Sequence, residues 1–172
     1  SKNISILIVK NNMSIQLNVQ PFQETLYAGM CGPASLKIVL AYYGIERTEN
    51  GLAQLCAVDS QLGVSDKDIK RVAEQCGLSV IVQNDATFHD LSSWLERGVP
   101  PIVNWFTRGR YDYPEDDVAD GHYSVVTGLD DLHIYLQDPE IGRIRKITRD
   151  DFMRVWFDFT GVCATPDTMI LR

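Results

Sequence analysis

The sequence predicts an α+β fold, in which helices come first along the chain and mostly antiparallel strands follow. Two observations support this prediction. Between residues 31 and 97, three segments with a helical pattern end just before Gly44, Gly77 and Gly98, and glycine is a common stop at a helix C-terminus. From Pro100 onward, apolar and polar residues alternate with a period of two, which is typical of half-buried strands.

The predicted helices differ in their patterns. Residues 31–43 are apolar nearly all round, which indicates a helix buried inside the protein. The helices predicted over 65–76 and 87–97 begin with the capping residues Ser65 and Thr87, each followed three residues later by an aspartate. These capping patterns set the N-terminal ends of both helices.

Strands are predicted at both ends of the chain. The first twenty residues alternate apolar and polar side chains, as one or two strands would. The strands predicted after residue 100 cover 101–105, 122–129, 132–138 and 142–147. A short helix over 149–156 and a last strand over 167–171 complete the chain.

Composition limits the class of protein. The chain has 172 residues, of which 45% are hydrophobic and 23% charged, the profile of one soluble globular domain over residues 1–172. A net charge of −7 argues against a nucleic-acid binder, which would usually carry a basic stripe. No apolar run is long enough to span a bilayer, so no transmembrane segment is predicted.

The four cysteines are scattered along the chain and include no Cys-x-x-Cys pair. This spacing predicts neither a disulfide framework nor a structural zinc site. We therefore expect no metal and no cofactor, and we expect a reducing, cytoplasmic compartment. Zinc hydrolase chemistry is also disfavoured, because the three histidines lie far apart and none is paired at helical spacing.

Cys31 is the candidate nucleophile. It lies in Met-Cys-Gly-Pro-Ala-Ser, at the first turn of the predicted buried helix. A helix N-terminus carries partial positive charge and free N–H groups, which favour a thiolate over a thiol. Gly32 allows another backbone to approach closely, and Pro33 is well tolerated at an early helical position. The alternative is that Cys31 is only a small buried side chain.

A thiolate nucleophile needs a base, and His122 is the candidate. His89 lies among charged neighbours in a predicted helix and His133 lies between apolar residues in a predicted strand, so we interpret both as surface or packing residues. His122, by contrast, opens a predicted strand, and Asp138 ends the next one.

The spacing of His122 and Asp138 predicts a contact. If the two strands form a hairpin whose loop is centred on Asp130, His122 stands directly opposite Asp138 on the same face of the sheet. A carboxylate there would hold the imidazole tautomer and stabilise the imidazolium. A slip by one residue would put the two side chains on opposite faces. The alternative is that Asp138 and Pro139 only form a turn.

Three further residues complete the predicted site. Gln23, eight residues before Cys31, could donate an amide hydrogen bond to a developing oxyanion, with the backbone N–H of Cys31 as a second donor. Gly121, directly before His122, and Trp105, which ends the preceding predicted strand, are expected to contact the substrate.

Together these residues resemble a known family. The set comprises Gln23, Cys31-Gly32-Pro33-Ala34-Ser35, Gly121-His122-Tyr123 and Asp138-Pro139. It is similar to the papain-like cysteine peptidases of bacteriocin processing, which cleave double-glycine leaders at ABC exporters, and to their stand-alone bacterial relatives. The similarity covers most of the chain, and it implies a papain-like fold with the cysteine on a helical lobe and the histidine and aspartate on a sheet lobe. In the family the gap between the glutamine and the cysteine is shorter than it is here.

The resemblance implies a cysteine peptidase that acts on a peptide or protein through an acyl-enzyme. An acyl-transferring transpeptidase would use the same site and would pass the acyl group to an amine or thiol. A non-catalytic peptide-binding module is a further alternative, although the chain keeps Cys31, His122 and Asp138. Because the chain has no transporter segments, it looks like a stand-alone member.

Five carboxylates lie between Asp112 and Asp120, directly before His122. We interpret them as a solvated loop of the sheet lobe, or as a cleft rim that attracts a cationic substrate. The ordered alternation of an EF-hand calcium loop is missing from this stretch.

Overall fold

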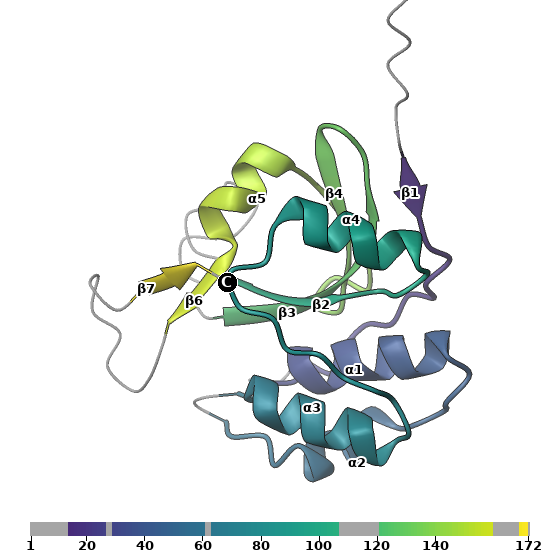
Figure 1. Ribbon diagram of the computed structural model, residues 1–172. Helices are drawn as coiled ribbons and strands as arrows, with labels where there is room; N and C mark the ends of the chain where they lie inside the picture. Colours follow the sequence, from purple (N-terminus) through teal and green to yellow (C-terminus); the bar gives the residue numbers. More distant parts are fainter. Residues whose placement is uncertain (1–13, 27–28, 61–62, 107–120, 160–168, 172) are drawn as a thin grey trace, which may run out of the picture.

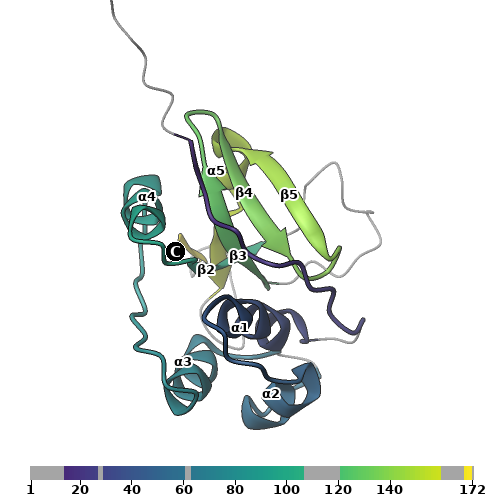
Figure 2. The ribbon, with the colours of Figure 1, turned by 90° about the vertical axis from the view of Figure 1, so that its right-hand side faces the viewer.

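Helices pack on both faces of a curled antiparallel sheet (Figures 1 and 2). A computed structural model describes residues 14–26, 29–60, 63–106, 121–159 and 169–171. One face of the sheet carries α1 (Cys31–Tyr42), which packs on α2 (Glu49–Leu55) and α3 (Asp66–Gln75). The other face carries α4 (Phe88–Glu96) and α5 (Arg149–Val155). The predicted α+β class is confirmed.

The sheet is built around β3 (Gly121–Leu129), which is buried over nearly its whole length. Along one edge of β3 lie β4 (His133–Asp138) and then β5 (Arg143–Thr148), and all pairings are antiparallel. The other edge is shared by β1 (Ile15–Gln16) at one end and β2 (Ile102–Phe106) at the other. A separate two-stranded sheet is formed by β6 (Phe157–Phe159) and β7 (Met169–Leu171).

Helix α1 joins two apolar clusters. Leu36 and Leu40 pack with side chains of α2 and α3, whereas Ile38 and Val39 pack against Val125 of β3. A third cluster fills the opposite face of the sheet with side chains from α4, α5 and the strands. Because α1 has apolar neighbours on both sides, its sequence is apolar nearly all round, as the buried helix predicted over 31–43 requires.

The structure adds one helix to those that were predicted. α2 begins after Thr48, whose side chain accepts a hydrogen bond from the N–H of Gly51. The helix has seven residues, and its buried positions are Glu49 and Leu52. Two turns with one buried apolar side chain are too short to display a helical period in the sequence. None of the described helices is both long and apolar enough to cross a bilayer.

The hairpin of β3 and β4 differs from the predicted register by two residues. Val125 pairs with Gln137, whereas a loop centred on Asp130 would have paired Val125 with Tyr135. The ladder also shifts at Thr127, which forms a β-bulge. Before the bulge the shift is two residues, which keeps His122 and Asp138 on one face, whereas a shift of one would not; at Gly128 and Leu129 the shift is three residues.

Some sequence predictions lie outside the described residues. These are the alternating residues 4–8, the carboxylates between Asp112 and Asp120, and Cys163.

Candidate active site

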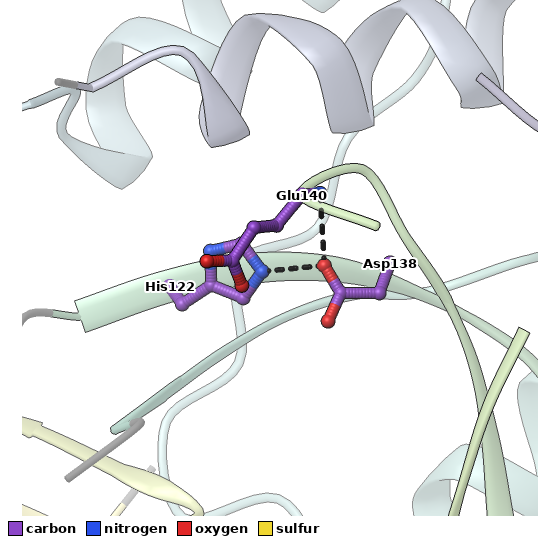
Figure 3. A group of neighbouring side chains, drawn as sticks. All are labelled: His122, Asp138 and Glu140. Carbon is purple, nitrogen blue, oxygen red and sulfur yellow. Dashed lines mark hydrogen bonds and ion pairs between the residues drawn. The ribbon is translucent and has the colours of Figure 1, made fainter. Parts of the chain in front are cut away.

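His122 and Asp138 meet at one end of the sheet. His122 lies at the start of β3, and Asp138 is the last residue of β4. Nε2 of His122 and Oδ1 of Asp138 are 2.7 Å apart, and both side chains are buried (Figure 3). The contact predicted from the sequence is therefore present, although as a diagonal neighbour across the hairpin and not as a directly opposite pair.

Arg145 and the turn after β4 complete the surroundings of Asp138. Its Oδ2 accepts from Nε of Arg145 at 2.6 Å, and its Oδ1 also accepts from the backbone N–H of Glu140 at 3.0 Å. The guanidinium of Arg145 also lies 3.8 Å from the carboxylate of Glu140. Sequence reasoning missed Arg145 and Glu140, which lie within eight residues of Asp138.

The pKa values of this pair favour an imidazolium beside a carboxylate. Burial lowers the pKa of His122, but hydrogen bonds to Asp138 and Cys31 and the attraction of both groups raise it to about 10. Burial raises the pKa of Asp138, but the hydrogen bond and charge of His122, together with Arg145, hold it below its usual value. At neutral pH the pair is therefore ionised.

Cys31 is the first residue of α1 and is half-buried. Its side chain interacts with His122 and helps to raise the pKa of that imidazole. Since Nε2 of His122 is engaged with Asp138, Nδ1 is the ring nitrogen open to the sulfur. The N-cap residue Met30 makes no side-chain hydrogen bond to the helix, so the first-turn N–H groups are not taken by this cap.

Trp105, which was expected to contact the substrate, is fully buried at 0% exposure. It stands opposite His122 in the β2–β3 pairing, and the two ring centroids are 5.4 Å apart in an edge-to-face arrangement. Its indole N–H donates to Oγ of Ser124 at 3.1 Å. The prediction for Trp105 is corrected: a side chain without solvent exposure supports the imidazole from within the core.

Gln23 and Gly121 are both exposed. The side-chain amide of Gln23 donates to the backbone carbonyl of Glu140 at 3.3 Å, and its Cβ lies close to Gly142. Gly121 is the first residue of β3, beside His122. The roles expected for both residues stay predictions.

The other described cysteines and histidines lie elsewhere. Cys56 is buried in the helical cluster, and this burial raises its pKa to about 11. Cys76 caps the C-terminal end of α3. Nδ1 of His133 lies 3.2 Å from Oδ1 of Asp130 at the turn between β3 and β4, and His89 is exposed on α4.

A metal ion does not fit the acidic group around His122. Potential ligand atoms of His122, Asp138 and Glu140 lie within 4.8 Å of one another (Figure 3). However, the positive guanidinium of Arg145 contacts both carboxylates, and both oxygens of Asp138 already accept hydrogen bonds. The guanidinium of Arg145 thus already lies beside the two carboxylates, where a metal cation would have to bind.

A cysteine at a helix start, a buried histidine and a carboxylate from a neighbouring strand are together characteristic of papain-like cysteine peptidases. Residues 13–164 match the model of the Peptidase_C39 like family. The chain belongs to this family, as the sequence resemblance implied.

Relatives occur in archaea and bacteria. The chain is 33% identical over 132 residues to protein MTBMA_c00490 of Methanothermobacter marburgensis, covering 76% of this chain and 77% of that protein. It is 30% identical over 140 residues to the lactococcin-G-processing and transport ATP-binding protein LagD of Lactococcus lactis. That match covers 79% of this chain but only 17% of LagD.

Solved structures share the fold. The peptidase domain of Streptococcus ComA, a bi-functional ABC transporter, superposes with a TM-score of 0.63 and 22% identity over 79% of this chain and 91% of that domain. A C39-like peptidase from Bacillus anthracis gives a TM-score of 0.66 and 19% identity over 84% of this chain and 92% of that one. These matches confirm the papain-like fold.

Proposed function

We propose that the chain is a cysteine peptidase that cleaves a peptide bond through an acyl-enzyme on Cys31. The observation that supports this proposal most directly is the buried hydrogen bond between His122 and Asp138, beside a Cys31 that interacts electrostatically with the same imidazole. Nucleophile, base and orienting carboxylate stand in the order that activates a thiol. Arg145 keeps the carboxylate ionised, because its positive charge favours the negative form.

The proposed reaction begins with Cys31 as a thiolate beside the imidazole of His122, which is already protonated at neutral pH. The sulfur then attacks the carbonyl carbon of the substrate, and the backbone N–H of Cys31 donates to the oxyanion that forms. The imidazolium gives its proton to the leaving nitrogen as the C–N bond breaks, which leaves a thioester. Water attacks this thioester while His122 takes one of its protons, and the carboxylic acid and the Cys31 thiolate are released beside the restored imidazolium.

Peptides are the proposed substrate class. One solved structure of similar fold is a double glycine motif protease from an AMS/PCAT transporter in complex with its leader peptide, with a TM-score of 0.51 and 21% identity over 81% of this chain. A peptide that contains a double-glycine site is therefore the first probe to include in a peptide library.

The test compares the wild-type chain with Cys31→Ala on that library. Wild-type protein should release product, whereas Cys31→Ala should release none, because alanine has no sulfur to form the thioester. Cys76→Ala is the matched control, since Cys76 is another half-buried free thiol outside the proposed site. Cleavage by Cys31→Ala at the wild-type rate would contradict the proposal.

The same assay distinguishes a peptidase from the transpeptidase alternative. Adding an amine acceptor should leave the hydrolysis product dominant if the chain is a peptidase. An acyl–acceptor product as the main species would instead favour the transpeptidase.

A further inference from the structure

Tyr123 connects the sheet with the helical part of the fold. It follows His122 on β3, and it shares the face of that strand with Val125, which packs on α1. The Tyr123 hydroxyl donates to Oδ1 of Asp66 at 2.6 Å, and the same oxygen lies 3.2 Å from the backbone carbonyl oxygen of Val64. Asp66 is the first residue of α3, so one side chain links β3 to the start of that helix.

The segment that Tyr123 holds packs on the first turn of α1. A Cβ at Gly32 would lie 3.3 Å from Cβ of Val64, so Val64 is in close contact with the backbone of Gly32. Both ribbon views show α1 between β3 and α3 (Figures 1 and 2). Because Gly32 follows Cys31 and Tyr123 follows His122, this contact lies next to both reactive residues.

The nucleophile and the imidazole belong to different parts of the fold, so their separation depends on how α1 sits on the sheet. Asp138 and Trp105 fix the imidazole of His122 relative to the sheet. Further along α1, Ile38 packs with Val125, but apolar packing is not directional. A hydrogen bond does fix a distance, and a misplacement of about 1 Å at a reacting group can cost about a hundredfold in rate.

We propose that Tyr123 is a positioning residue, whose hydrogen bond to Asp66 sets the separation between the sulfur of Cys31 and the imidazole of His122. The inference rests on the proposed peptidase function. Tyr123 is 8% exposed and acts through the start of α3 and the first turn of α1, not on the substrate. Without the hydroxyl, these segments can shift relative to β3, and the sulfur then interacts more weakly with the imidazole.

An NMR titration of the His122 imidazole measures this interaction without any substrate. Cys31 raises the pKa of His122, so Cys31→Ala should lower it. We expect this lowering to be smaller in a Tyr123→Phe background, because a more distant sulfur interacts more weakly. Burial and the charges of Asp138 and Glu24 also act on His122, but they are common to both members of each pair.

Tyr135→Phe is the matched control for the titration. The hydroxyl of Tyr135 also donates to an aspartate, at 2.7 Å from Oδ2 of Asp130, beside the turn between β3 and β4. Tyr135→Phe should therefore leave the effect of Cys31→Ala on His122 at its wild-type size. If Tyr123→Phe lowers the melting temperature and leaves that effect unchanged, Tyr123 is only structural and the proposal is wrong.

Peptide cleavage gives a second readout. Tyr123→Phe should lower kcat about tenfold with KM nearly unchanged, whereas Tyr135→Phe should keep the wild-type kcat. Asp66→Asn retains an acceptor oxygen and should keep most of the activity, while Asp66→Ala should lose about as much as Tyr123→Phe. The double variant should lose no more than either single variant, because both remove the same hydrogen bond. Losses that multiply in the double variant would contradict the proposal.

The outcomes separate this proposal from the peptidase function. Wild-type protein that cleaves no peptide would overturn the peptidase function, while the His122 titration would still decide whether Tyr123 sets the separation from Cys31. Wild-type protein that cleaves, with equal kcat in Tyr123→Phe and Tyr135→Phe, would overturn the role of Tyr123 alone.

Discussion

At the scale of single residues, Asp138 has a donor on each of its buried oxygens. Because its pKa lies below the ordinary 3.8, its contribution to folding is present above that pH and is lost as the pH falls further. The pKa of His122 is raised, so its contribution is present below pH 6.5 and is lost as the pH rises toward about 10. Both contributions are complete between pH 3.8 and pH 6.5.

Replacing Arg145 by methionine removes the positive charge beside Asp138 and Glu140. Breaking a buried ion pair by removing one partner costs about 3–5 kcal/mol, and we expect Arg145→Met to lose unfolding free energy in that range at pH 7. The pKa of Asp138 should rise without the arginine, so the variant should lose stability at a higher pH during acid titration. Urea unfolding at several pH values measures both effects.

Two further variants control for this change. Arg143 is an exposed arginine on the same strand, so Arg143→Met should be nearly neutral. Arg145→Lys keeps the charge but not the planar fork, and should recover part of the loss. If Arg145→Met is as stable as Arg143→Met, the ion pair with Asp138 does not stabilise the fold.

Cys31, His122 and Asp138 could be predicted because each lies at the start or end of an element with a clear pattern. Arg145 could not, because Arg-Ile-Arg-Lys has the pattern of an exposed strand, and β5 is mostly exposed. Arg145 pairs with Leu136 in the ladder and reaches Asp138 diagonally. This contact depends on the register, which the sequence predicted incorrectly.

At the scale of elements, two local features set the register of β3 and β4. The carboxylate of Asp130 accepts from the backbone N–H groups of Leu132 and His133, which sets the turn. At the bulge, Oγ1 of Thr127 donates to the carbonyl of Tyr135 and accepts from the amide of Gln16. Side-chain hydrogen bonds of this kind are not visible in a pattern of apolar alternation. The sequence could therefore predict which face of the sheet carries His122 and Asp138, but not the register in which β3 and β4 pair.

The bulge also brings β1 against Gly128. A Cβ at this position would lie 2.5 Å from the carbonyl oxygen of Ile15 and would meet the side chain of Gln16. We expect Gly128→Ala to displace β1 and to cost about 1–3 kcal/mol of unfolding free energy, as overpacking does. The N–H of Leu17, which donates to the carbonyl of Thr127, should then exchange faster with solvent. Unchanged exchange at Leu17 would mean that β1 tolerates the methyl group.

At the scale of the whole molecule, the proposed site combines a residue of the helical part of the fold with residues of the sheet. Cys31 belongs to the helix that packs on α2 and α3, whereas His122 and Asp138 belong to the sheet. The site therefore forms only when α1 is docked on β3. The class of fold could be predicted from the order of helical and alternating segments, but this docking depends on packing between distant side chains such as Ile38 and Val125.

Since α1 packs both on α2 and α3 and on the sheet, we expect the helices and the sheet to unfold together. This is the behaviour of the single domain that the sequence predicts. Ile38 is only 2% exposed and packs with Val125, so Ile38→Ala should leave a cavity and cost about 2–5 kcal/mol. Fluorescence of the buried Trp105 and Trp156 reports on the sheet side, and mass-spectrometric labelling of the buried Cys56 reports on the helical side. In a denaturant titration both midpoints should coincide and should move together in Ile38→Ala.

Leu132→Ala is the control for this titration, because Leu132 is 69% exposed and its truncation should move neither midpoint. A cavity at Ile38 removes packing between α1 and β3, so two independently folding parts would respond unequally to it. A lower midpoint for Cys56 labelling with an unchanged fluorescence midpoint would therefore show that the helical side unfolds alone. In that case Cys31 would leave His122 before the sheet unfolds, and activity should be lost at the lower of the two midpoints.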